Sequence, residues 1–201
     1  MLKAAATALL FSFAAIPVSS LSASAETAIF AGGCFWCVES DFDQVPGVTS
    51  TVSGYIGGTT QNPTYYDHGA GRHREAVKIE FDPATVSYDQ LVATFFRTID
   101  PTDGGGQFCD RGFSYSTAVY AVNDAQKAAA DKAKAEAAAT LNTPIATEVA
   151  AAPEFWPAED YHQNYYRTNS AKYKYYRFAC GRDARIKDVW GAEAFQGIPA
   201  H

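Results

Sequence analysis

Short apolar runs along the chain are separated by polar and glycine-rich segments. Residues 28–31 are continuously apolar, which predicts a buried strand. Residues 47–58 combine glycine with β-branched side chains, and residues 77–81 alternate strictly between apolar and polar, so each segment predicts a further strand. Residues 117–122 and 145–149 are shorter runs of the same kind. The pattern therefore predicts about five strands.

Segments of helical character lie between these strands. Ser87 and Gln90 have the spacing of a capping box, which predicts a helix directly after the serine. Residues 124–141 are rich in Ala, Lys and Glu and predict an exposed helix, because these residues have high helix propensity. Residues 35–45, which follow two glycines, and the aromatic segment 159–166 predict two more helices.

The order of these elements predicts an α+β fold. Strands and helices alternate at both ends of the core, and the chain has no repeat or low-complexity segment. We expect a two-layer sandwich in which helices cover a sheet. Residues 178–201 show little periodicity, so we expect a long coil tail with one or two short turns.

The first residues are typical of an export signal. Lys3 gives a basic start, residues 4–18 are apolar, and Ala23-Ser24-Ala25 fits the small-residue rule for cleavage. We therefore expect a signal peptide at residues 1–25, a single domain at residues 26–201, and a protein that is periplasmic or secreted. The apolar run is short for a membrane span, and no later stretch approaches about 20 apolar residues.

The charge balance restricts the partners. The chain has 16 Lys and Arg against 22 Asp and Glu, a formal net charge of −6. Nucleic acids and anionic lipid surfaces attract basic proteins, so this balance argues against both as partners.

Residues 32–37, Gly-Gly-Cys-Phe-Trp-Cys, are the most distinctive stretch. Two glycines allow a sharp turn from strand to helix, which places Cys34 at a helix N-terminus. Unpaired N–H groups and the helix dipole stabilise an anion there. We therefore expect the pKa of Cys34 to lie below its usual value of about 8.5, and the thiolate to be reactive.

Other interpretations of the four cysteines remain open at this point. Four cysteines in an exported chain are often structural disulfides. Zinc needs about four ligands, and the sequence has no second pair of Cys or His at ligand spacing, so we expect no metal site.

Two further enzyme classes use a reactive cysteine. A cysteine hydrolase could use Cys34 with His162 and Asn164, but Ala28 stands where papain-like proteases have a glutamine. A thiol–disulfide oxidoreductase could use the Cys-x-x-Cys pair. The chain lacks the cis-proline and the spacing that a thioredoxin-like domain requires.

Five segments, in this order, carry a family resemblance. They are GCFWCVE (33–39), GYIGG (54–58), HREAV (73–77), the glycine-rich segment 100–116 and AEDYHQNY (158–165). Together they resemble the A-type peptide methionine sulfoxide reductases over essentially the whole mature chain. The resemblance implies a split βαβ (ferredoxin-like) core with long coils. It also implies reduction of the S epimer of methionine sulfoxide, free or in proteins, without a cofactor.

The resemblance also implies roles for particular residues. The Cys34 thiolate would attack the sulfoxide sulfur and end as a sulfenic acid, releasing methionine. Phe35 and Trp36 would form the walls of a pocket for the substrate methyl group. Glu75 would be a protonated acid with a raised pKa. The matching positions for hydroxyl donors and a polar helper are Tyr55, Tyr115 and Asp110.

A second cysteine would then form a disulfide with Cys34, and a thioredoxin-type reductant would restore the thiols. Cys180, in the tail, resembles the C-terminal recycling position of the family and is our first candidate. Cys37 is the second, because it is only three residues from Cys34. Cys109, in the glycine-rich segment, is the third.

Overall fold

The computed structural model describes residues 25–199. The predicted signal peptide, apart from Ala25, lies outside the described residues, so its cleavage stays a prediction. Within residues 25–199, no helix combines the length and the hydropathy that are needed to cross a membrane.

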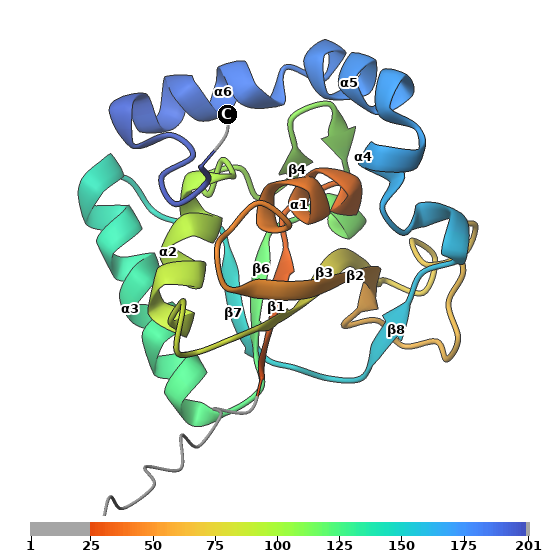
Figure 1. Cartoon of the computed structure of the whole chain (residues 1–201), viewed down its shortest axis with the longest axis horizontal. Coiled ribbons are helices and arrows are strands. Elements are labelled where there is room, and N and C mark those ends of the chain that lie inside the picture. The colour runs from red at the N-terminus through yellow and green to blue at the C-terminus, as the bar shows by residue number, and fades with distance from the viewer. Residues whose placement is uncertain (1–24, 200–201) are drawn as a thin grey trace, which may run out of the picture.

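Six strands of this part of the chain form one curled, mixed sheet in the order β7-β6-β1-β3-β2-β8 (Figure 1). β6 and β7 are parallel, and all other neighbours are antiparallel. The strand bounds are β1 (Glu26–Ala31), β2 (Val48–Ile56), β3 (Arg74–Phe81), β6 (Ala118–Ala121), β7 (Glu148–Ala151) and β8 (Phe155–Pro157). A separate two-stranded ribbon consists of β4 (Gly106–Gln107) and β5 (Asp110–Arg111). The five predicted strands are all present.

The described residues also contain six helices. Their bounds are α1 (Phe35–Phe42), α2 (Tyr88–Arg97), α3 (Asp124–Leu141), α4 (Tyr165–Thr168), α5 (Ser170–Ala179) and α6 (Arg182–Trp190). The capping box before α2 is present, since Ser87 Oγ accepts the Gln90 N–H while the Gln90 side chain accepts the Ser87 N–H. Three short 3-10 turns are η1 (Phe113–Tyr115), η2 (Asp160–His162) and η3 (Gly191–Glu193).

The main hydrophobic core lies between one face of the sheet and the helices. Ala28 and Phe30 of β1 belong to this core together with residues of α1, α2 and α3. Ile29 and Ala31 belong to a smaller cluster, because alternate residues of a strand point to opposite faces. Phe30 stacks on Phe95 of α2 with ring centroids 4.7 Å apart. The sequence predicted an α+β sandwich, and the structure shows a mixed α/β fold in which helices pack on a curled six-stranded sheet.

The turn from β1 to α1 requires its two glycines. A Cβ on Gly32 would lie 2.9 Å from Val38 and 3.1 Å from Phe95, closer than packed side chains allow. Gly33 has φ = 84°, a conformation that residues with a Cβ rarely adopt. The turn therefore lets β1 and α1 approach closely and places Cys34 at the start of the helix.

The helix predicted at residues 159–166 is wrong as a single element. This segment contains η2, a break and the start of α4. Asn164, at the break, has a left-handed backbone (φ = 51°), and its N–H donates to the Glu39 carboxylate at 3.0 Å. The chain thus turns at Asn164 to satisfy a buried carboxylate of α1.

The prediction of a coil tail after residue 178 is also wrong, because α6 follows α5 almost directly and the chain packs back onto the core (Figure 1). Ile186 and Trp190 of α6 lie in the core. Arg182, which is only 1% exposed, donates to the carbonyl oxygens of Gly32 at 3.1 Å and Thr98 at 2.8 Å. A buried arginine at an inward-facing position hides the amphipathic pattern of this helix.

Candidate active site

Cys34 and Glu75 meet where α1 begins beside β3. Cys34 is the N-cap residue of α1 and is 7% exposed, and Glu75 of β3 is 2% exposed. The Phe35 N–H, at the helix N-terminus, donates to Glu75 Oε2 at 3.0 Å. A cavity of about 50 Å³ opens between them. Its lining residues are Cys34, Phe35, Trp36, Tyr65, Glu75, Asp110, Tyr115 and Tyr176.

Burial, together with the nearby Asp110 carboxylate, raises the pKa of Glu75 to about 8. The Phe35 N–H and a hydrogen bond with Tyr115 act in the opposite direction and are too weak to compensate. Glu75 is therefore a carboxylic acid at neutral pH, and its role as the proton donor stays a prediction.

The expectation of a low pKa for Cys34 is wrong. Burial raises the pKa of the Cys34 thiol, and the Cys37 side chain and the Glu75 charge raise it further. A hydrogen bond with Tyr176 lowers it without reversing the direction. Desolvation of a thiolate at this depth outweighs the stabilisation that a helix N-terminus provides.

The second cysteine of the motif has the opposite character. Cys37 is 1% exposed and is hydrogen-bonded to the Cys34 side chain. Burial alone raises the pKa of Cys37, but the bond with Cys34 and the charges of Arg182 and Arg177 lower it overall. The protonation states of the two sulfur atoms, which lie at the N-terminal end of α1, therefore depend on each other.

An aromatic wall borders the cavity. Trp36 stacks on Tyr165 with ring centroids 3.8 Å apart, and its Nε1–H donates to His162 Nδ1 at 3.2 Å. Phe35 packs against the His162 ring at 5.0 Å. Phe35 and Trp36 therefore both line the cavity, and their role as walls for the substrate methyl group stays a prediction. His162 orients Trp36, which argues against its use as the base of a cysteine hydrolase.

The predicted hydroxyl donors lie in different places. Tyr115, in η1, lines the cavity and is hydrogen-bonded to Glu75. Tyr55 is fully buried outside the lining, and its hydroxyl donates to Glu159 at 2.9 Å. Sequence reasoning missed Tyr65 and Tyr176, which line the cavity. Neither is marked by the sequence, since each is one of several neighbouring tyrosines.

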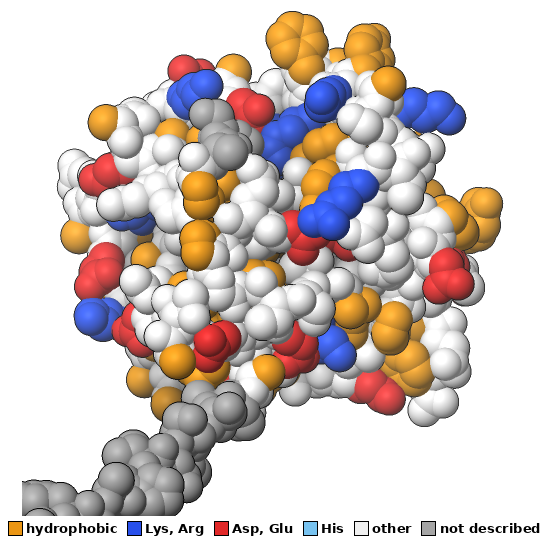
Figure 2. Space-filling view, in the orientation of Figure 1, with side chains coloured by type: hydrophobic (Ala, Val, Ile, Leu, Met, Phe, Trp, Pro, Cys, Tyr) orange, Lys and Arg blue, Asp and Glu red, His pale blue; other side chains and the backbone are white. Residues whose placement is uncertain are grey.

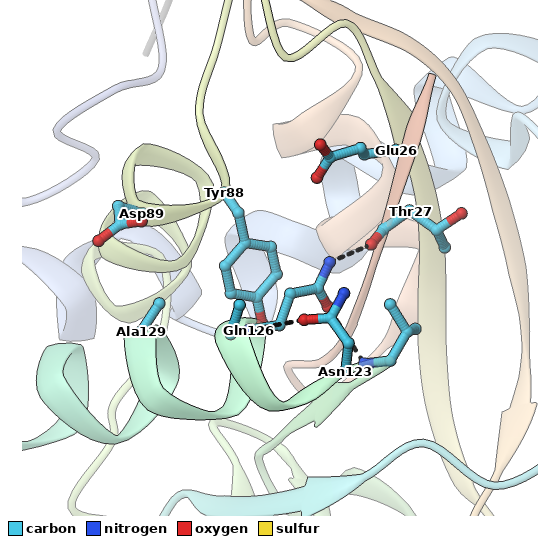
Figure 3. Close-up of a pocket in the computed structure, with 9 residues that line it drawn as sticks. Glu26, Thr27, Tyr88, Asp89, Asn123, Gln126 and Ala129 are labelled. Carbon is cyan, nitrogen blue, oxygen red and sulfur yellow. Dashed lines mark hydrogen bonds between the residues drawn. The ribbon is translucent and has the colours of Figure 1, made fainter. Parts of the chain in front are cut away.

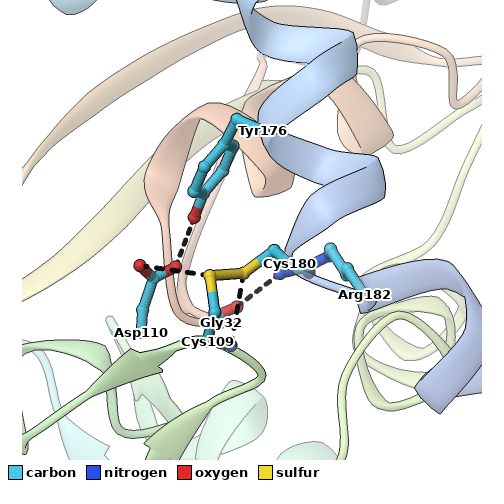
Figure 4. Close-up of a disulfide and its surroundings, with 6 residues drawn as sticks. All are labelled: Gly32, Cys109, Asp110, Tyr176, Cys180 and Arg182. Carbon is cyan, nitrogen blue, oxygen red and sulfur yellow. Dashed lines mark hydrogen bonds between the residues drawn. A yellow bond between two sulfur atoms is a disulfide. The ribbon is translucent and has the colours of Figure 1, made fainter.

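A disulfide joins Cys109 and Cys180 with a Cα–Cα distance of 5.0 Å (Figure 4). Cys34 and Cys37 are free thiols. Two of the three candidate resolving cysteines are therefore bonded to each other, and the third contacts Cys34. Asp110 lies within 4.8 Å of both disulfide sulfurs, but sulfurs bonded to each other offer no thiolates for a metal ion.

A larger pocket of about 390 Å³ lies away from Cys34, between β1 and the start of α3 (Figure 3). Gln126 Nε2 donates to the Thr27 carbonyl at 2.7 Å, and Gln126 Oε1 accepts the Val122 N–H at 3.2 Å. Asn123 caps α3 through the Gln126 N–H at 2.9 Å. These hydrogen bonds connect α3 to the sheet. Of the described residues, no cysteine lines this larger pocket, so the volume of a pocket does not by itself identify the reactive site.

Comparisons with known proteins agree with this site. Residues 26–194 match the family model described as peptide methionine sulfoxide reductase. The chain is 55% identical to peptide methionine sulfoxide reductase MsrA 2 of Rhizobium meliloti (strain 1021), across 88% of this chain and 89% of that protein. It is 50% identical to the MsrA 2 of Caulobacter vibrioides, across 83% and 86%.

A solved structure, methionine sulfoxide reductase A of Corynebacterium diphtheriae, superposes with a TM-score of 0.66. It is 32% identical in sequence, and the alignment covers 76% of this chain and 77% of that one. The structural match thus extends over most of the fold, and the family model, over residues 26–194, includes the strand, turn and helix that carry Cys34. The chain belongs to the peptide methionine sulfoxide reductase family.

Proposed function

We propose that this protein reduces the S epimer of methionine sulfoxide, free or in polypeptides, to methionine. The observation that carries the proposal is a buried cysteine beside a carboxylic acid whose pKa is about 8, in a small aromatic cavity. A sulfoxide sulfur becomes electrophilic when its oxygen receives a proton, and Glu75 can supply that proton at neutral pH.

The residues of the cavity have separate tasks in this reaction. The Cys34 thiolate attacks the sulfur while Glu75 protonates the oxygen. The oxygen leaves with Cys34 as sulfenic acid, and methionine is released. Phe35 and Trp36 enclose the substrate methyl group, and Tyr115 orients the oxygen. Tyr55 supports Phe35 from beneath, with ring centroids 5.9 Å apart.

We rank the candidate resolving cysteines differently once their positions in the structure are considered. Cys180 is bonded to Cys109, whereas Cys37 is a free thiol in contact with Cys34. We therefore place Cys37 first: its sulfur attacks the sulfenic acid, a Cys34–Cys37 disulfide forms, and water leaves. A thioredoxin-type dithiol then reduces that disulfide. For Cys180 or Cys109 to take over that disulfide by thiol–disulfide exchange, their own bond must first be reduced to thiols.

We also assign the core to the split βαβ, ferredoxin-like type. The strand order supports this assignment, because β3 lies between β1 and β2, and β1 lies between β3 and β6. This arrangement makes β3 a neighbour of the β1–α1 turn, which is how Glu75 comes to lie beside Cys34. We also propose that the protein is exported. In the oxidising compartment that an exported protein meets, the free thiols of Cys34 and Cys37 would need a dedicated reductant.

The test supplies dithiothreitol and each methionine sulfoxide epimer separately, and measures methionine. The wild-type protein should reduce the S epimer, and Cys34→Ser should have no activity while its thermal unfolding is unchanged. Turnover of both epimers at equal rates, or activity in Cys34→Ser, would contradict the proposal.

A further inference from the structure

We propose that Tyr176 and Asp110 form a proton relay that accepts the thiol proton of Cys34. A neighbouring disulfide, Cys109–Cys180, fixes the two relay residues relative to each other. The inference rests on the reductase activity proposed above and adds to it the group that makes Cys34 a nucleophile.

The site needs such a base for a chemical reason. Cys34 is buried, and its pKa is raised by that burial, so the thiol form dominates at neutral pH. Glu75 cannot accept the proton, because it must itself be protonated to deliver a proton to the sulfoxide oxygen. The remaining acceptors in reach of Cys34 are Cys37 and, through Tyr176, Asp110.

Tyr176 links Cys34 to Asp110 directly. Its hydroxyl donates to Asp110 Oδ2, and its side chain borders the cavity beside Cys34 and favours the Cys34 thiolate by lowering the pKa of that thiol. All three residues line the same cavity. Figure 4 shows the tyrosine ring extending from α5 towards the Asp110 carboxylate, directly beside the disulfide.

The transfer balances in protons and charge. The Cys34 S–H proton moves to the Tyr176 oxygen as the Tyr176 O–H proton moves to Asp110 Oδ2. The products are a Cys34 thiolate and a neutral Asp110, so the total charge of the three groups does not change. Tyr176 is neutral before and after the transfer, which agrees with a pKa that burial raises strongly.

The disulfide connects the two elements that carry the relay. Cys109 directly precedes Asp110, and Cys180 follows Tyr176 by four residues, one turn along α5 and its C-cap. The two cysteines are 71 residues apart in sequence, and the Cys109 N–H also donates to Cys180 Sγ at 3.2 Å. The bond therefore sets the distance between the ribbon β4–β5 and α5, and with it the hydrogen bond of the relay.

Other titratable and charged groups face the relay and affect its pH dependence. Cys37 on α1 and Glu75 on β3 face Cys34. Burial raises the pKa of Asp110, and the Tyr176 hydrogen bond and the charge of Arg182 oppose that rise. Tyr65 and Tyr115 border the same cavity. The experiment must therefore separate Tyr176 from these neighbours.

Single-turnover methionine release provides that separation, because it precedes any disulfide formation. One equivalent of methionine sulfoxide is added to protein whose Cys34 and Cys37 are reduced. Tyr176→Phe should lower the rate at pH 7 by about 10²-fold, the usual size of a general-base contribution. The deficit should shrink as the pH rises, because thiolate then forms without the relay.

Tyr175→Phe is the matched control on the same helix, since Tyr175 is 75% exposed. An unchanged rate in Tyr176→Phe would overturn the relay.

Asp110→Asn provides a second, independent variant. It should lose about as much rate as Tyr176→Phe, and the double variant should lose no more, because the two residues act in one path. A rate loss in the double variant equal to the product of the two single losses would contradict a shared path. Cys37→Ser tests the alternative base: a loss as large as that in Tyr176→Phe, with the same pH trend, would identify Cys37 as the base instead.

The disulfide is tested in the same assay with Cys109→Ser combined with Cys180→Ser. The expected result is a rate about 10-fold lower with the same pH trend as Tyr176→Phe, consistent with partial loss of a general-base contribution. A wild-type rate in this variant would show that the disulfide does not position the relay. Absence of methionine release from the wild-type protein would instead reject the reductase activity, so the two failures are distinguishable.

Discussion

At the scale of single residues, the site contains two carboxyl groups in unlike surroundings. Glu75 lies in the interior with its pKa raised to about 8. Asp110 is partly exposed; burial raises its pKa, and the hydrogen bond from Tyr176 and the charge of Arg182 oppose that rise. The surroundings therefore favour the protonated form of Glu75 much more strongly than that of Asp110, as a proton donor and an acceptor at one site require.

Glu75→Gln tests the proton donor. The variant keeps a hydrogen-bond donor but no transferable proton, so kcat should fall by about 10²–10⁴-fold. The wild-type rate should decline as the pH rises through about 8, because the protonated acid is the active form, and the variant should lack that decline. A pH profile with the same alkaline limb in both proteins would assign that limb to another group.

The same pKa affects stability. The folded state holds the Glu75 proton up to about 8, and the unfolded chain loses it near 4.5. The free energy of unfolding should therefore decrease between these values as the pH rises. Chemical denaturation of the wild type and Glu75→Gln across pH 4–9 should show a smaller decrease in the variant. An equal decrease would mean that Glu75 ionises as it does in the unfolded chain.

Peptide mapping tests the resolving cysteine. One equivalent of methionine sulfoxide added to the enzyme without reductant should give a Cys34–Cys37 disulfide, since these thiols are already in contact. Cys109 and Cys180 should be found bonded to each other before and after the reaction. A Cys34–Cys180 linkage would restore the order expected from the sequence.

At the scale of elements, the β1–α1 turn determines where the nucleophile lies. Gly33→Ala should destabilise the fold by about 1–3 kcal/mol from backbone strain, and more from the new Cβ, which would lie 2.7 Å from Gln107. Gly112→Ala is the matched control, because it also has a positive φ (108°) but nothing within 4 Å of a new Cβ. Denaturant unfolding that gave equal losses would remove the packing part of the argument.

Elements with regular periodicity could be predicted from the sequence, and elements held by buried charges could not. The capping box at Ser87 and the alanine-rich helix α3 depend on local chemistry, so the sequence alone predicts them well. The helix α6 contains the buried Arg182, whose partners are carbonyl oxygens from distant segments. Local pattern does not encode such partners.

The candidate site follows the same division. Cys34 was predicted from its place after two glycines, and Glu75 was predicted only through the family resemblance of residues 73–77. Tyr176 belongs to a helix that was not predicted, so its approach to Cys34 depends on tertiary packing. The disulfide Cys109–Cys180 could not be chosen from the sequence, because four cysteines allow three pairings when all are bonded.

At the scale of the whole molecule, export remains a prediction. Residues 23–25 follow a short apolar run and fit a cleavage site after Ala25. Mass spectrometry of the protein purified from the periplasm or medium should therefore find Glu26 as the first residue. Recovery of a chain that still begins with Met1 from that compartment would contradict cleavage.

The surface of the folded chain is uneven in character. Hydrophobic side chains project at the end of the molecule that carries α5 (Figure 2). The exposed aromatic residues of this helix are Tyr175 and Phe178, which are 75% and 85% exposed. The reactive sulfur, by contrast, is almost fully enclosed.

The cavity of about 50 Å³ has a consequence for the range of proteins that can be repaired. It admits the end of one oxidised side chain and excludes the backbone that carries it. A target must therefore extend that side chain outward, from a loop, a terminus or an unfolded stretch. Oxidised methionines packed inside a folded target stay out of reach until that target opens. The extent of repair is then set by the local stability of the damaged protein as much as by the enzyme.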